Sequence, residues 1–538
     1  MTHSLPAVLW ILVDGLSCNL LARFAAAYPE STLGALVSRG RMRPLAPLRP
    51  NCQTPPSLFS IWSGKDVDEH KLTGYDVPVE IEGDPAAYVD AFSSWPKNIP
   101  MIWDRYAQAE CTVRLCSIPF VQPERLGRYL LSSSATYGLP IVQPTLVSLD
   151  ETFSSAELGL EFTLTGTDST LFLMHRTGNV TAVPIGASVD LPLSEVNAAG
   201  PHHYYLAVKV TAMVIEGQVK LMLHGYSSVD VNGFALSTMY EQQRDRSFVS
   251  MNPAKLYQAN LLGRRLRDGG KGEAESILAD LMKPLHDSFT GEITRAVEAN
   301  DAQLVIGYYP VIDLLSHQIL ANEFSTSFDG SVGSQHLFSV LLEFDRWLSG
   351  LLPRVADNTR VVIHSDHGMT PLKWDVYPNR FLLAAGWLVL RPDDSLDTDR
   401  SVAFFHPAEN GLLVVHVQRA QQYGFAIDIE MAALNEQLAQ FGLSKVSILQ
   451  AAPAAISDQW DTRHYLQPPD EGRLRFGHPE TLVSKSHKGG DHTVYHSAPW
   501  LRGVLVDASQ TAFTNSSVDE LTLPSILETV LHTEDREA

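Results

Sequence analysis

Three apolar runs constrain the fold of this chain most strongly, because each of them ends abruptly at residues that can carry chemistry. The runs cover residues 7–13, 303–309 and 360–364. They lead to Asp14, to Asp313, and to the adjacent pair Asp366 and His367. Continuous runs of this kind are typical of strands buried on both faces, as in a parallel α/β sheet. Because ligands bind beyond the carboxyl ends of strands in open α/β sheets, the sequence predicts one shared site there.

Helical patterns separate these runs and indicate the fold class. They cover about 20–38, 254–299 and 335–352. Strands that alternate with helices favour βαβ units, so we predict an α/β fold with a mostly parallel central sheet flanked by helices. The chain has 538 residues, more than one ordinary domain, which leaves room for inserted substructures.

Two segments are predicted to be insertions into this core. Between about 150 and 240, β-forming residues bunch between turn residues, notably at 163–167, 171–174, 204–210 and 218–224, which predicts an antiparallel β-rich unit. The second segment combines a predicted strand at 412–416 with a helix near 427–441. We therefore assign the α/β core to 1–95, 250–372 and 480–538, the β-rich insertion to 96–249, and the second insertion to 373–479.

Charge and composition exclude several partners. The formal net charge is −21, whereas a surface that binds duplex nucleic acid needs clustered Lys and Arg, so no nucleic-acid polymer is expected. A small phosphate-containing substrate remains compatible with this charge, because bound divalent cations would dominate the local field. Whether the chain forms a homo-oligomer is left open.

The sequence also predicts a cytoplasmic protein without membrane contact. Four cysteines without disulfide-type spacing favour a reducing compartment. The run 7–13 is short and follows no basic segment, so it is a strand and not a signal peptide. No stretch reaches the roughly 18 apolar residues that cross a bilayer.

Two short motifs carry residues of the types that hold metal ions. Asp313 and His317 lie four residues apart just past a strand, so on a helix they would share one face and could bind one cation. Asp366 and His367 follow another strand in a turn bounded by glycine. Carboxylates and imidazoles without thiolates suit Zn²⁺ or Mn²⁺ in an open catalytic site. A single Asp or His of this kind, Asp14 included, is more often a cap or packing residue, so the hypothesis rests on the combination.

The segment 49–64 contains the candidate nucleophile. Thr54 before Pro55 is a good helix start, with Thr at the N-cap and Pro in the first turn. Its hydroxyl either only caps the helix or lies at a helix N-terminus where anions bind. Pro55 and Pro56 remove two backbone donors, so an anion would rely on metal ions, the Thr54 N–H and the Ser57 side chain.

Taken together, these segments resemble the alkaline phosphatase superfamily, nearest to its type I phosphodiesterase and nucleotide pyrophosphatase branch. Six elements appear in the family's order: Asp14-Gly15 after a strand, Thr54-x-Pro56-x-x-x-Ser60-x-x-Ser63-Gly64 followed by His70 and Gly74, Asp313-x-x-x-His317, Ser365-Asp366-His367-Gly368-Met369, Gly490-Asp491-His492, and the closing helix near 521–527. The resemblance covers about 1–95, 255–372 and 480–530.

The resemblance implies a site with two divalent ions. Zn²⁺ is the ion that the family implies, and Mn²⁺ is the alternative. The ligand sets would be Asp313, His317 and His492 for one ion, and Asp14, Asp366 and His367 for the other. Thr54 would lie between the ions, as ligand and as nucleophile. A threonine hydroxyl is a poor nucleophile until its pKa is lowered, and two ions about 4 Å apart can stabilise the attacking and leaving oxygens of an in-line displacement.

The sequence departs from the family pattern in two places. Diesterase members often have Asn three residues after the nucleophile, where this chain has Ser57, a shorter donor, so substrate preference is open. The last ligand His is usually followed by Gly, yet His492 precedes Thr493. His487 is therefore a competing assignment, although the segment Gly490-Asp491-His492 fits the family better.

The resemblance implies hydrolysis of phosphodiester or nucleotide pyrophosphate bonds through a phosphothreonine intermediate. One alternative is a phosphomonoesterase or phosphonate hydrolase that uses the same site. A third, from another class, is a catalytically silent binding protein that kept the fold. The intact nucleophile and ligand set argue against the silent protein.

Overall fold

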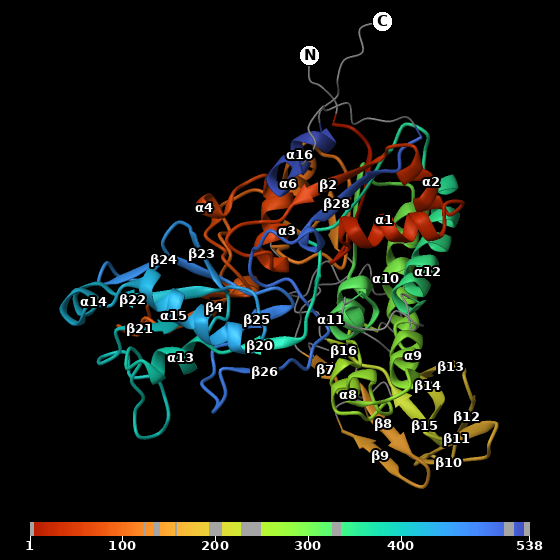
Figure 1. Cartoon of the computed structure of the whole chain (residues 1–538). Coiled ribbons are helices and arrows are strands. Elements are labelled where there is room, and N and C mark those ends of the chain that lie inside the picture. The colour runs from red at the N-terminus through yellow and green to blue at the C-terminus, as the bar shows by residue number, and fades with distance from the viewer. Residues whose placement is uncertain are drawn as a thin grey trace, which may run out of the picture.

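The structure is a computed structural model that describes residues 5–122, 125–132, 140–156, 159–192, 207–227, 249–324, 335–510 and 521–531 (Figure 1). Part of the predicted strand at 204–210 lies outside these residues. Within the described ranges, none of the helices combines the length and hydropathy that crossing a bilayer requires. The four cysteines lie in the described ranges and form no disulfide.

An eight-stranded sheet forms the centre of the molecule and confirms the predicted α/β class. In spatial order its strands are β29 (Leu521–Thr522), β2 (Met42–Ala46), β28 (Gly503–Asp507), β18 (Arg360–His364), β1 (Val8–Val13), β17 (Leu304–Tyr309), β5 (Val113–Cys116) and β6 (Leu130–Ser132). The pairings are parallel except those of β28, which runs antiparallel to β18 and β2. The three predicted strands β18, β1 and β17 are central neighbours and are almost fully buried.

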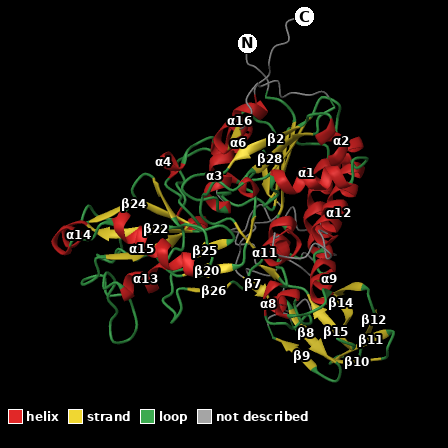
Figure 2. Ribbon diagram, in the orientation of Figure 1, coloured by secondary structure: helices red, strands yellow, loops and turns green. Residues whose placement is uncertain are grey.

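Helices cover both faces of this sheet (Figure 2). One group contains α1 (Cys18–Ala27), α2 (Thr32–Ser38), α10 (Lys283–Glu298) and α12 (Gln335–Leu351). The other contains α3 (Thr54–Ser63), α6 (Ile102–Gln108) and α16 (Leu523–Leu531). This cover explains why the central strands read as continuous apolar runs and do not alternate.

Two of the predicted helices are divided in the structure. The single helix expected over 20–38 is two helices, because Pro29 stands between α1 and α2 and a proline cannot continue a helix through its interior. The pattern over 254–299 is divided into α8 (Ala254–Gln258), α9 (Glu273–Asp280) and α10. Glycines at 269, 270 and 272 interrupt it. The predicted helix over 335–352 is confirmed as α12.

The β-rich insertion is built from two antiparallel four-stranded sheets. The first contains β12 (Val180–Pro184), β11 (Thr170–His175), β10 (Leu160–Gly166) and β9 (Thr152–Ser155). The second contains β13 (Ser188–Pro192), β14 (Ala207–Ile215), β15 (Gln218–Leu223) and β8 (Thr145–Ser148). Buried residues alternate along β10 because only one face of its sheet is covered.

The second insertion has a hydrophobic core of its own. Its four-stranded sheet contains β21 (Ala403–Phe405), β22 (Leu412–His416), β24 (Trp460–Gln467) and β23 (Ser447–Gln450). The strand predicted at 412–416 is β22, and the helix predicted near 427–441 is α15 (Ile427–Gln440). β5 and β6 fall within 96–249, the range assigned to the β-rich insertion, yet they are strands of the central sheet, so the insertion begins later in the chain than predicted. The other boundaries stay predictions.

Candidate metal and phosphoryl-transfer site

Three neighbouring strands deliver polar side chains to one buried place. Asp14 follows β1, and its N–H donates to the carbonyl of Tyr309 at the end of β17 (3.0 Å). Asp313 lies in the first turn of α11 (Val311–Phe324), directly after β17. Asp366 and His367 follow β18 and are completely buried. The shared site expected at the strand ends is therefore present in the geometry.

Gly15 allows this convergence. It has a φ of +68°, which L side chains rarely adopt, and a Cβ at this position would lie 2.9 Å from Asp313. The glycine thus lets the turn after β1 pass directly against the start of α11.

The first group of candidate ligands contains Asp14, Asp366 and His367. The Nε2 atom of His367 lies 3.3 Å from Asp14 Oδ1 and 3.1 Å from Asp366 Oδ2. One potential ligand atom from each residue lies within 4.8 Å of the others. This set can enclose one cation.

The second group contains Asp313, His317 and His492. His317 Nε2 lies 3.5 Å from Asp313 Oδ2 and 3.2 Å from His492 Nε2, and His492 Nε2 lies 3.5 Å from Asp313 Oδ1. The His367 and His492 rings stack with centroids 3.7 Å apart. His367 is also within 4.8 Å of ligand atoms of Asp313 and His492, so it lies between the two predicted sets.

Backbone carbonyls orient all three imidazoles in the same way. The Nδ1 atoms of His317, His367 and His492 lie 2.9, 3.0 and 3.0 Å from the carbonyl oxygens of Gly490, Gly368 and Cys52. A carbonyl can only accept, so each Nδ1 carries the proton and each Nε2 lone pair faces the cluster. This arrangement is the usual support for histidines that bind a metal through Nε2.

The three carboxylates fit a divalent cation because each of them has one buried oxygen without a hydrogen-bond partner among the described residues. Oδ1 of Asp14, Oδ1 of Asp313 and Oδ2 of Asp366 accept no hydrogen bond from the described residues. An unsatisfied buried carboxylate is costly unless a charge compensates it. Cations in the two groups would supply that compensation, so the residues present fit the implied metal ions.

The pKa shifts have the same physical origin. Burial, followed by the charges of Asp366 and Asp313, raises the pKa of Asp14 well above its usual range. Burial also raises the pKa of Asp313 to about 7. Burial lowers the pKa of His317 and of His492 well below the usual range, so both imidazoles are neutral and available as ligands.

Thr54 lies at the start of α3, but its hydroxyl does not cap the helix. The N-cap is Gln53, Thr54 is the first helical residue, and no side chain caps this end. The prediction of Thr54 as N-cap is thus wrong by one residue. Its Oγ1 is instead 3.3 Å from Nε2 of His367, beside the first ligand group. Of the two interpretations of this hydroxyl, the structure favours the one at an anion site.

Ser57 lies one turn further along α3, and its side chain is fully buried. Its Oγ has no hydrogen-bond partner among the described residues. A hydroxyl buried in this way has a donor and an acceptor to offer. The geometry is therefore compatible with the predicted contact to a phosphoryl oxygen.

His487 does not reach the cluster. Its side chain is exposed, whereas His492 is buried beside Asp313 and His317. Between them, Gly489 packs against α11, where its N–H donates to the His317 carbonyl (2.7 Å). The structure therefore brings His492 to the site and leaves His487 at the surface.

We expect His492→Ala to lose one of two bound metal ions, because its Nε2 faces the second ligand group. The matched control is His487→Ala, which should keep both ions and change the free energy of unfolding by no more than about 0.5 kcal/mol. Elemental analysis of both purified variants measures this. Metal loss in His487→Ala alone would reverse the assignment.

Sequence reasoning missed the role of Tyr308 at this site. Its hydroxyl donates a hydrogen bond to Oδ2 of Asp14. The sequence offered a signal, because a phenol inside an otherwise apolar buried strand normally has a polar partner. Tyr309, its neighbour on β17, has its hydroxyl 2.9 Å from His286 Nδ1 instead.

We expect Tyr308→Phe to weaken metal binding by about 10- to 100-fold, because groups that orient a ligand carboxylate have effects of this size. Tyr309→Phe is the matched control: it removes a phenol from the same strand but should leave metal affinity unchanged. Titration with a competing chelator measures both affinities. Equal losses in the two variants would contradict a specific role for Tyr308.

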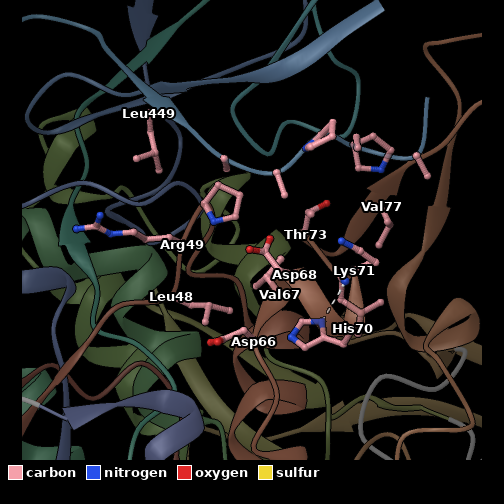
Figure 3. A pocket seen from close by; sticks show the side chains of 18 of the residues that line it. Leu48, Arg49, Asp66, Val67, Asp68, His70, Lys71, Thr73, Val77 and Leu449 are labelled. Atoms are coloured by element: carbon pink, nitrogen blue, oxygen red, sulfur yellow. Dashed lines mark hydrogen bonds between the residues drawn. The ribbon is translucent and has the colours of Figure 1, made fainter. Parts of the chain in front are cut away.

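A larger cavity, of about 950 Å³, lies elsewhere, between the segment around α4 (Val67–His70) and residues 449–455 of the second insertion (Figure 3). None of the predicted ligands lines it. His70, at its wall, has both ring nitrogens engaged: Nδ1 accepts from the Leu72 N–H (3.1 Å), so Nε2 donates to Ser60 Oγ (2.9 Å). Burial lowers the pKa of His70 to about 3. His70 thus supports α3 and is not a ligand.

Comparisons with known proteins place the site in a family context. The family described as type I phosphodiesterase / nucleotide pyrophosphatase matches residues 225–442. A comparison with curated proteins found no relative of this chain. Among solved structures, phosphonoacetate hydrolase from Sinorhizobium meliloti 1021, in complex with phosphonoformate, is similar with 11% identity and a TM-score of 0.46, over 98% of this chain and 95% of that chain.

A second similar structure is murine ectonucleotide pyrophosphatase / phosphodiesterase 5, an inactive variant in complex with AMP. It has 10% identity and a TM-score of 0.45, over 97% of this chain and 93% of that chain. At these scores the two structures add no argument about this site.

Proposed function

We propose that this chain, part of which matches the type I phosphodiesterase / nucleotide pyrophosphatase family, is a hydrolase of the alkaline phosphatase superfamily that cleaves phosphodiester or nucleotide pyrophosphate bonds through a phosphothreonine at Thr54. One observation carries this proposal: the Thr54 hydroxyl lies at a helix start beside two groups of buried carboxylates and imidazoles. We further propose that these groups hold two divalent ions, of which Zn²⁺ suits the ligand types best and Mn²⁺ is the alternative.

The residues of the site have defined parts in the proposed reaction. When bound, the two ions would activate the nucleophile and neutralise charge on the phosphoryl oxygens. Thr54 Oγ1 loses its proton and attacks phosphorus in line with the leaving oxygen. The phosphothreonine forms as the bond from phosphorus to that oxygen breaks, and the leaving group departs with a proton. Water then attacks the phosphothreonine, which releases the phosphate product and restores the threonine hydroxyl. Thr54 Oγ1 lies 3.3 Å from His367 Nε2, so the nucleophile is next to the first ligand group.

The start of α3 binds the phosphoryl group. The Thr54 N–H is at the first helical position and has no acceptor among the described residues, and the Ser57 Oγ is also unpaired. Both can donate to a phosphoryl oxygen, as expected for a helix N-terminus that binds an anion. Both residues are buried, and burial strengthens hydrogen bonds to an anion.

Ser57 also supports a second candidate function. Its side chain is shorter than the Asn of many diesterases, so it leaves more room around the phosphoryl oxygens. A phosphomonoesterase or phosphonate hydrolase with the same nucleophile and ions is therefore the alternative. The cytoplasmic location expected from the sequence stays a prediction.

Substrate profiling tests the proposal. The Zn²⁺- and Mn²⁺-loaded protein would be assayed with bis-aryl phosphodiesters, aryl monoesters, dinucleotide pyrophosphates and phosphonates. We expect the diester or pyrophosphate substrates to have the highest kcat/KM. Turnover confined to monoesters or phosphonates would favour the alternative, and no turnover of any class by protein with both ions bound would contradict the proposal.

A further inference from the structure

A small polar cavity adjoins the second ligand group. It has a volume of about 230 Å³, and His317 and His492 form part of its wall. Most of its other lining residues are polar or charged. Sites for drug-sized organic ligands are larger, about 300–1,000 Å³, and mostly apolar. The cavity therefore suits a compact charged group better than a nucleobase.

Most charged side chains of this cavity already have partners. Arg473 forms two bonds with Asp375, from Nε (2.7 Å) and Nη2 (3.3 Å). Glu409 pairs with Arg475 at 2.8 Å. The carboxylate of Asp491 accepts from the N–H and the hydroxyl of Thr493 (3.2 and 3.1 Å). The charges of Arg473 and Glu409 are thus compensated by ion pairs, whereas Asp491 keeps its negative charge because both of its donors are neutral.

Lys488 differs from them. Lys488 lines the cavity, and its side chain forms no hydrogen bond or ion pair with any residue that the structure describes. Its backbone is fixed, because the Lys488 N–H donates to Ser486 Oγ (3.2 Å) and the next residue, Gly489, packs on α11. Burial lowers the pKa of Lys488, with Asp491 acting in the opposite direction, and the residue as a whole is half-buried.

We propose that Lys488 binds a second anionic group of the substrate, one that lies close to the scissile phosphorus. This inference rests on the proposed function, since it places the scissile phosphoryl group at Thr54 and the second anion in the adjoining cavity. The chemistry shared by the fitting substrates is a phosphate or a carboxylate a few bonds from the phosphorus. A substrate with a neutral group in that position leaves the ammonium unpaired and binds less well.

A merely electrostatic role of Lys488 makes a different prediction. A cation that only tunes the ligand groups would change the binding of all phosphorus compounds by a similar factor. A lysine that contacts the second anion changes the ratio between a charged probe and its neutral or truncated counterpart. The ratio is therefore the quantity to measure.

Binding would be measured by calorimetry with the metal-loaded full chain carrying Thr54→Ala, so that no probe is consumed. Phosphoglycolate against its amide tests the carboxylate, and ADP against AMP tests the second phosphate. We expect at least one charged probe to bind about tenfold or more tightly than its counterpart. Lys488→Met should bring that ratio close to one, and Lys488→Arg should keep much of it.

Lys485→Met is the matched control, because Lys485 is an exposed lysine in the same segment. It should leave both ratios unchanged. If Lys488→Met lowers the affinity ratio for only one of the two probe pairs, that pair identifies the second anion as a carboxylate or as a phosphate. Either result supports the inference. Ratios that are near one in the parent chain, or that Lys488→Met leaves intact, would overturn it. Failure of the proposed function appears separately, as absent turnover in the metal-loaded wild-type chain.

Discussion

Thr54→Ala is expected to lower kcat/KM by about 10³-fold or more, with the fold and the metal content retained. The nucleophile and the ions act as a unit, so removing the hydroxyl removes most of the catalysis that the unit supplies. Little structure depends on this side chain, because among the described residues its hydroxyl has a polar contact with His367 alone and it caps no helix. Steady-state kinetics, elemental analysis and thermal unfolding of the variant measure these three properties.

Thr54→Ser is the matched control, since it keeps a hydroxyl at the same place and removes only a methyl group. It should retain far more activity than Thr54→Ala. If the alanine variant kept more than about a tenth of the wild-type activity, the hydroxyl would not be the nucleophile.

Removal of the metal ions should abolish turnover as completely as loss of Thr54. Without cations the cluster holds three buried carboxylates, each with one oxygen that has no hydrogen-bond partner among the described residues, and burial raises the pKa of Asp14 and Asp313. Neither an activated hydroxyl nor charge neutralisation at phosphorus is then available. Treatment with a chelator should silence the protein, and added Zn²⁺ or Mn²⁺ should restore it.

Elemental analysis during the re-addition of Zn²⁺ or Mn²⁺ gives the number of ions bound per chain. Activity should return as two ions bind per chain, because the ligand atoms form two groups that share His367 as neighbour. Full activity with one ion or none would rule out a two-metal site.

The part of this site that could be predicted from the sequence is the part encoded by short segments. Asp14, Asp313 and Asp366 each directly follow a strand that is buried on both faces, so an apolar run and its end residue were sufficient to locate them. The spacing of Asp313 and His317 is likewise local, because one helix, α11, carries both. Parallel pairing of the three strands then brings the segments together.

Features that depend on tertiary packing could not be predicted. The sequence favoured His492 over His487 only through the family resemblance, because the choice itself depends on how Gly489 and Gly490 pack against α11. The helix boundary at Thr54 was wrong by one residue because proline is tolerated at both the first and second positions of a helix. The Lys488 cavity needs residues from several segments, so no local pattern indicates it.

Gly74 belongs to the family motif, but the reason for a glycine at this position also depends on tertiary packing. A Cβ there would lie 2.4 Å from Oε1 of Gln53, the N-cap of α3. The glycine thus allows the chain to pass beside the start of the nucleophile helix. The motif located this residue, and the structure shows that a Cβ here would displace the Gln53 side chain, whose Oε1 accepts from the Tyr75 N–H (2.6 Å).

The stereochemical course at phosphorus tests the covalent role of Thr54 most directly. Each in-line displacement inverts phosphorus, so attack by Thr54 followed by attack of water on the phosphothreonine gives net retention. The measurement is hydrolysis of a phosphodiester made chiral at phosphorus with sulfur and oxygen isotopes, followed by configurational analysis of the product. The account predicts retention; inversion would show that water attacks the substrate directly and would contradict it.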